Sequence, residues 1–196
     1  MTTITLERPQ LALGAGYFFL APLGSTLPAM TVAGSIFTDA WPAAWVLKGG
    51  TDKGTVLNHE VKATPIEAAE WYNPLQYETD GTETSLEGAL LSITATNLKA
   101  LANGGSIAVT GTGATTLNAF TPADPGSEIR QMLGWESRDY TERVIMEQVF
   151  QVGRISISRN KGGGNRATMP FKFMAEIPSG AGAKPFRYWS AGVARA

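Results

Sequence analysis

Apolar and polar side chains alternate along Met169–Ile177, and this pattern constrains the fold more than any other feature of the sequence. The odd-numbered positions are all apolar, whereas Lys172 and Glu176 fall on the opposite side. A β-strand with one buried face requires this pattern, because successive side chains point to opposite faces of a sheet. Shorter stretches of the same alternation recur along the chain, so the sequence predicts a mainly β protein.

Further strands are predicted wherever a similar pattern lies between turn residues. We expect them at residues 16–21, 45–48, 55–62, 85–93, 115–120, 128–136, 143–151, 154–159 and 186–189. The glycine-rich segment 160–165 would join the strand at 154–159 to Met169–Ile177 as a hairpin loop, which makes three successive antiparallel strands. A single helix is predicted after Thr94 or Thr96, either of which can cap its start, and Asn103-Gly104 supplies a left-handed stop.

The composition fits this interpretation, with 22 glycines, 11 prolines and 43% hydrophobic residues among 196. Many short strands and one helix favour a β-sandwich or partly closed barrel with one flanking α-helix. We expect one domain over residues 16–196.

Two segments lack a consistent period. Residues 1–15 contain Pro9 and Gly14, and we expect them to form an extended N-terminal arm. Residues 64–84 carry Trp71, Tyr72 and Leu75, and we expect a long insertion loop there. Long loops without structure of their own are usually functional, so we expect both segments to become ordered on a partner.

Charge is divided unevenly along the chain, although the formal net charge is only −1. Residues 1–147 hold 8 basic and 16 acidic side chains, whereas residues 148–196 hold 8 basic and 1 acidic. The two parts could attract each other within one domain, or they could form opposite surfaces that favour head-to-tail self-association. Nucleic-acid binding is disfavoured, because the cations follow alternating strands without a basic helix.

The chain has few of the residues that commonly carry catalysis or bind metal ions. The chain has no cysteine and a single histidine, His59, on a predicted strand. We therefore expect no thiolate or multi-histidine metal site, no cofactor and no enzyme activity. The apolar run Tyr17–Ala21 ends at Pro22 and is too short to cross a bilayer, so no membrane insertion by this chain is expected.

The order of short motifs resembles one known family. The segment Ala21-Pro22-Leu23-Gly24-Ser25-Thr26-Leu27-Pro28, followed by Trp45-Val46-Leu47-Lys48-Gly49-Gly50-Thr51 and Gly54, is similar to the start of major tail tube proteins of long, non-contractile-tailed bacteriophages. A later Thr82–Leu86 segment, a helix and the strand from Pro170 complete the resemblance over residues 16–191. Ser25 stands where threonine is usual, and Lys48 separates Leu47 from the glycine that often follows it directly.

The resemblance implies a structural virion protein of the phage tail, assembled in the host cytoplasm. Six copies would form a ring, and stacked rings would form a tube around the tape measure protein, bounded by tail terminator and distal tail proteins. DNA would later pass through the tube without specific binding. The family has no active site to carry over.

For such an assembly, we expect an interface that includes Phe18, Phe19, Trp71, Tyr72, Leu75, Arg154, Arg159 and Lys161. The basic stretch Arg154–Lys172 would contact neighbouring copies instead of lining the lumen. Two alternatives remain: a tail terminator or baseplate ring protein of related fold, and a secreted carbohydrate-binding module that stacks sugars on Trp71 and Tyr72.

Overall fold

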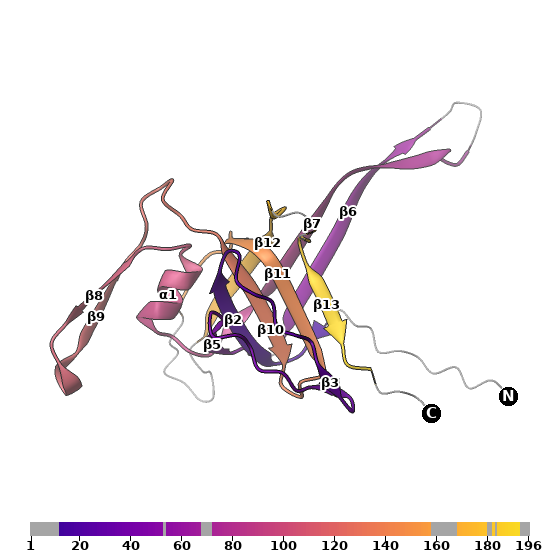
Figure 1. The fold of residues 1–196 in the computed structure, drawn as a ribbon. Coiled ribbons are helices and arrows are strands. Elements are labelled where there is room, and N and C mark those ends of the chain that lie inside the picture. Colours follow the sequence, from indigo (N-terminus) through magenta and orange to yellow (C-terminus); the bar gives the residue numbers. More distant parts are fainter. Residues whose placement is uncertain are drawn as a thin grey trace, which may run out of the picture.

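The fold is built on one large antiparallel sheet of nine strands (Figure 1). The structure is a computed structural model, and it describes residues 12–52, 54–67, 72–157, 168–179, 182 and 184–192. β13 (Arg187–Ser190) pairs with β11 beside the main path of the sheet. In spatial order the other strands are β1 (Ala12–Leu13), β6 (Thr55–Ile66), β7 (Gln76–Leu90), β12 (Met169–Ala175), β11 (Glu142–Gln151), β10 (Gln131–Ser137), β2 (Gly16–Pro22) and β5 (Val46–Gly50).

The sheet curls until the end of β5 meets β7. Thr51 forms an isolated antiparallel bridge with Leu90, and the Asp52 amide donates a 2.8 Å hydrogen bond to the Ala89 carbonyl. This single bridge joins the edge strand β5 to the interior strand β7, where a full ladder would be needed to close a barrel. The mainly β, sandwich-like class expected from the sequence is confirmed.

Strand β2 shows how alternation builds two cores. Phe18 and Leu20 lie in the main core, on one face of the sheet, together with Trp135 and Phe173. Phe19 alternates with them and lies in a second cluster on the other face. The members of this second cluster are Phe19, Ala21, Trp45, Met132 and Ile145, and Leu27, Met30 and Trp41 of the segment 23–45 pack against it. This segment also contains the short strands β3 (Val32–Ala33) and β4 (Ile36–Phe37).

The predicted helix is confirmed as α1 (Ala95–Leu101). Thr94 is its N-cap and accepts a 3.1 Å hydrogen bond from the Asn97 amide. Asn103 and Gly104 follow with φ of 52° and 126°, the left-handed conformation that ends helices. Beyond them, β8 (Ser106–Thr110) and β9 (Leu117–Thr121) form a separate two-stranded hairpin around the short 3-10 helix η1 (Gly113–Thr115).

Most predicted strands overlap strands of the structure, but three expectations are wrong. The segment 64–84 is not a loop, because Thr64–Ile66 and Gln76–Thr84 are the paired far end of the β6–β7 hairpin. In the predicted arm 1–15, Ala12 and Leu13 form β1; residues 1–11 lie outside the described residues. Residues 154–157 do not form a strand, because β11 pairs directly with β12, and Ile155 instead packs against the main core.

Candidate assembly surfaces

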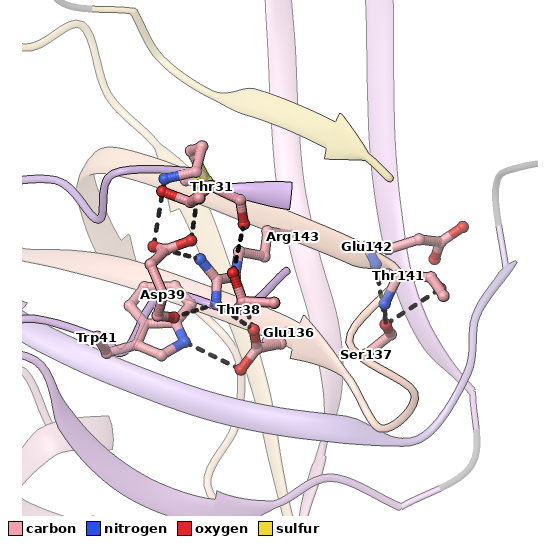
Figure 2. A network of polar contacts seen from close by, with 10 residues as sticks. Thr31, Thr38, Asp39, Trp41, Glu136, Ser137, Thr141, Glu142 and Arg143 are labelled. Carbon is pink, nitrogen blue, oxygen red and sulfur yellow. Dashed lines mark hydrogen bonds and ion pairs between the residues drawn. The ribbon is translucent and has the colours of Figure 1, made fainter. Parts of the chain in front are cut away.

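A buried arginine fixes the segment 23–45 to the outer face of the sheet (Figure 2). Arg143 on β11 is 1% exposed. Its Nη1 lies 2.8 Å from Asp39 Oδ2, and its Nε donates a 2.6 Å hydrogen bond to Glu136 Oε1. Trp41 Nε1 donates to the other Glu136 oxygen at 3.0 Å. The Arg143 guanidinium also lies over the Phe37 and Trp41 rings, at 4.7 and 5.4 Å from their centroids. We call Asp39, Trp41, Glu136 and Arg143 the arginine clamp.

The clamp shifts the pKa of Asp39. Burial alone raises the pKa of this carboxyl, but the hydrogen bond and positive charge of Arg143 outweigh burial, so the Asp39 pKa lies below its usual value of 3.8. Asp39 also accepts hydrogen bonds from the Met30 and Thr31 amides, at 3.2 and 2.7 Å. The clamp is therefore a charged, fully partnered anchor that holds a covering segment in place.

The far part of the β6–β7 hairpin extends well beyond the body of the molecule (Figure 1). Every residue from Asn58 to Ile66 is exposed. The Leu75 amide donates a 2.9 Å hydrogen bond to the Ile66 carbonyl near the tip, beside the fully exposed Tyr72. We call residues 58–66 and 72–84 the long arm; Trp71, within the connection at its tip, lies outside the described residues.

The register of the long arm separates an apolar face from a charged face. Pro65 is opposite Tyr77, and Val61 and Ala63 share their face because they precede Pro65 at alternate positions of β6. The same alternation places this face in line with the core residue Leu57. Val61 is 53% exposed and Tyr77 is 63% exposed. The long arm thus presents apolar side chains that nothing in the described part of the chain covers.

The opposite face of the hairpin is charged. Glu60 is directly opposite Glu83, and Lys62 Nζ lies 2.6 Å from a Glu83 oxygen. Nearer the body, Lys172 Nζ lies 2.8 Å from Glu87, and this hydrogen bond holds the pKa of Glu87 below its usual range. Exposed pairs of this kind contribute little to stability, because solvent screens their attraction.

A second exposed hairpin, β8–β9, lies on another side of the molecule (Figure 1). Val109 and Leu117 are 63% and 64% exposed, and no charged residue occurs between Ala100 and Ala123. Strand β8 was missed in the sequence analysis. The alternation of Ile107 and Val109 with the small residues Ser106, Ala108 and Thr110 is a signal that could have found it.

An apolar groove of about 500 Å³ lies where β2, β5 and β10 meet. The exposed side chains of Leu23, Val46 and Ile129 line it, with Lys48 and Arg130 beside them. Burial lowers the pKa of Lys48. The groove is built from strands other than those of either projecting hairpin.

The structure separates the residues expected in the assembly interface. Phe18 and Phe19 were wrongly assigned to it, because both are buried, in the main core and the second cluster. Tyr72 and Leu75 lie exposed in the long arm. Arg154 is exposed just beyond β11. Three more, Trp71, Arg159 and Lys161, lie outside the described residues.

The basic C-terminal part is partly neutralised within the chain. Lys172 pairs with Glu87, and Arg187 lies 2.7 Å from Glu147. For Lys172 and Arg187, the acidic and basic parts of the chain therefore attract each other within one domain.

The described residues offer little from which a metal site or a membrane-spanning helix could be built. Across the described ranges, no group of three or more His, Asp and Glu side chains is arranged to hold a metal ion. No helix among the described residues has the length and apolar character needed to cross a membrane. His59 lies on β6, where Nδ1 is 2.8 Å from Thr84 Oγ1 and the ring packs beside Phe186. No protein-family model and no curated protein matches the chain.

Proposed function

We propose that this chain is a structural protein of a virion, the major tail tube protein of a long-tailed phage, and that it acts by self-assembly and not by catalysis. The observation that carries the proposal is the long arm, a two-stranded extension with an uncovered apolar face. The motif order in the sequence, described above, points to the same family. Six copies in a ring, and rings stacked into a tube around a tape measure protein, are what this family implies.

The long arm supports assembly because an isolated two-stranded hairpin is only marginally stable in water. Exposed apolar area costs about 25 cal/mol per Å² relative to burial, so covering Val61, Tyr72 and Tyr77 would stabilise an assembled state. Contiguous exposed apolar surface on a soluble protein commonly marks an interaction site.

The location of the exposed surfaces favours an open, stacked assembly over a closed dimer. The long arm is formed by β6 and β7, whereas the groove lined by Leu23, Val46 and Ile129 lies at other strands, so they are different surfaces of one molecule. A contact between unlike surfaces is heterologous, and repeating it builds rings or filaments instead of two-fold dimers. A tail tube needs both kinds of repetition, around each ring and between rings.

The test is electron microscopy of the purified full-length chain, with light scattering at increasing concentration. We expect six-fold rings and tubes. Single rings that never stack would indicate a terminator or baseplate protein, and a persistent monomer that binds polysaccharide would indicate a carbohydrate-binding module. A persistent monomer at high concentration overturns the proposal.

A matched pair of variants tests the role of the long arm. The double variant Val61→Ser, Tyr77→Ser removes its apolar face, and we expect a folded monomer that no longer forms tubes. Ile66→Ser removes one exposed apolar side chain from the opposite face of the same hairpin and should still assemble. Equal tube formation by both variants would contradict the assignment.

A further inference from the structure

The apolar groove between β2, β5 and β10 carries positive charge. Leu23, Val46 and Ile129, which line it, are 48%, 51% and 48% exposed. Lys48 and Arg130 are the charged residues of its lining, and none of its described lining residues is acidic. Exposed apolar surface commonly marks an interaction site, and cations beside it favour a partner of the opposite charge.

Lys48 is the cation of the groove that lacks a carboxylate. Arg130 lies 3.3 Å from Glu176, whereas Lys48 makes no ion pair with any described residue. Lys48 is partly buried, and burial lowers its pKa. A charge that is partly removed from water without a counter-charge costs free energy, and a carboxylate from another molecule would offset that cost.

The tip of the long arm matches this groove in both apolar character and charge. We call residues 65–67 and 72–78 the arm tip. Tyr72 is fully exposed there, and Leu75 and Tyr77 are 58% and 63% exposed. Glu67 and Glu78 precede and follow these residues in the sequence, and neither makes an ion pair with a described residue. The arm tip contains no lysine or arginine.

We propose that the arm tip of one copy docks in the groove of a second copy, with its exposed apolar side chains against the apolar lining and a tip carboxylate beside Lys48. The inference rests on the proposed function, because it names the surface that receives the long arm during self-assembly. Docking would remove apolar area from water on both surfaces and would give Lys48 its counter-charge.

The occupant is a second copy because a chain cannot fill its own groove. The long arm extends away from the body (Figure 1), and residues 58–66 span about 30 Å at about 3.3 Å per residue. The groove is formed by β2, β5 and β10 of the body. Each copy therefore offers one tip and one groove, so the contact is heterologous and can be repeated from copy to copy.

A single contact of this kind is small, so its strength must come from repetition. A groove of about 500 Å³ admits only a few side chains, and a stable pair of proteins usually buries at least about 1,200 Å². In an assembly each copy would donate one tip and receive another, and closing a ring makes the last contact intramolecular. We therefore expect weak association of isolated pairs and strong association in the assembly.

Cysteine cross-linking tests the contact, because the chain has no cysteine of its own. The test variant carries Leu75→Cys at the tip and Val46→Cys in the groove. The control variant carries Leu75→Cys and Val109→Cys, with its second cysteine on the exposed β8–β9 hairpin. All three positions are more than half exposed, so the substitutions should leave the fold intact. A second test variant has Ile129→Cys in place of Val46→Cys.

We expect mild oxidation, at the protein concentrations used for microscopy, to produce a ladder of disulfide-linked multimers from at least one test variant and little from the control. Equal cross-linking of the control overturns the inference. A disulfide within one chain, or tip-to-tip dimers of the single variant Leu75→Cys, also overturns it. Tubes that form without this cross-link leave the proposed function standing and overturn the inference. A ladder without six-fold rings or tubes does the reverse.

Charge reversal in the cysteine-free chain tests the role of Lys48. Lys48→Glu should raise the protein concentration at which light scattering detects assembly by roughly three- to tenfold, because it replaces an attraction to the acidic tip by a repulsion. Lys184→Glu makes the same change in net charge at an exposed position outside the groove and should leave that concentration unchanged. Equal thresholds for the two variants would overturn the placement of a tip carboxylate beside Lys48.

Discussion

Replacing Arg143 by methionine removes the cation of the arginine clamp while keeping an unbranched side chain of similar length. The Glu136 side chain is 4% exposed and that of Asp39 is 13% exposed, so both carboxylates would remain desolvated without their counter-charge. Removing one partner of a buried ion pair typically costs about 3–5 kcal/mol. A loss of 1 kcal/mol lowers Tm by about 2–4 °C for a chain of this size, so we expect a decrease of roughly 6–20 °C.

The same variant should change how stability depends on pH. The Asp39 pKa in the parent is lower in the folded state than its usual value of 3.8, so its contribution to stability is present above that value and is lost as pH falls through the folded pKa. Without Arg143, only backbone hydrogen bonds still oppose burial, which is the largest influence on the Asp39 pKa and raises it. The folded pKa should therefore rise, so protonation of Asp39 then favours folding. The stability difference between parent and variant should therefore be largest near about pH 7 and shrink toward about pH 4.

Urea denaturation of dilute monomer, followed by tryptophan fluorescence at both pH values, measures these differences. Arg130→Met is the control, since it removes a surface pair with Glu176 and should cost only about 0–1 kcal/mol. Arg143→Lys keeps the charge but loses the paired geometry of the guanidinium. Its loss of unfolding free energy should lie between those of Arg130→Met and Arg143→Met, so it replaces Arg143→Met in the comparison if that variant does not fold. Equal costs for Arg143→Met and Arg130→Met, or a difference that does not change with pH, would refute the reasoning.

Two further substitutions test how the sheet packs against its neighbours. A Cβ at Gly134 would lie 2.4 Å from the Trp41 ring, so Gly134→Ala should displace that ring and lower the unfolding free energy by about 1–3 kcal/mol. Gly192 has open space around it, so Gly192→Ala should be near neutral in the same urea titration. Asn97→Ala removes a 2.7 Å hydrogen bond to the Lys48 carbonyl and should lower the unfolding free energy by about 1–3 kcal/mol. Amide exchange should become faster in α1 alone. Unchanged exchange in α1 would show that Asn97 does not hold the helix against β5.

The parts of the fold that sequence predicted well are those where burial and periodicity agree. Met169–Ala175 alternates because Met169, Phe171 and Phe173 are buried on one face while Lys172 faces Glu87. The helix was predicted because its cap and its stop depend on local chemistry, in Thr94 and Asn103. Local signals of this kind need no knowledge of the rest of the chain.

The long arm was mistaken for a loop for the opposite reason. Its charged face and its apolar face are both exposed, so no buried face imposes a clean alternation of the kind in Met169–Ala175. The part of β7 near the tip is rich in Thr, Glu and Asp, which are typical of loops. In the segment 154–157 a strand was predicted where the structure has none. Ile155 is apolar there because it packs on the main core, although it has no strand partner. Arg143 was also missed, because its partner Asp39 is far away in the sequence and an arginine in a strand normally indicates a solvent-facing position.

The strand order also determines the sequence of events as the chain is synthesised. β6 and β7 follow each other in the sequence and can pair once Leu90 has emerged. In contrast, β2 needs β10, and β7 needs β12, which ends at Ala175. Elongation at about 5–20 residues per second separates these two points by roughly 4–17 seconds. Because local pairings close before distant ones, the ribosome-bound chain displays the long arm before the body that carries it exists. If the chain assembles as proposed, contacts between neighbouring nascent chains on one message would begin at the long arm.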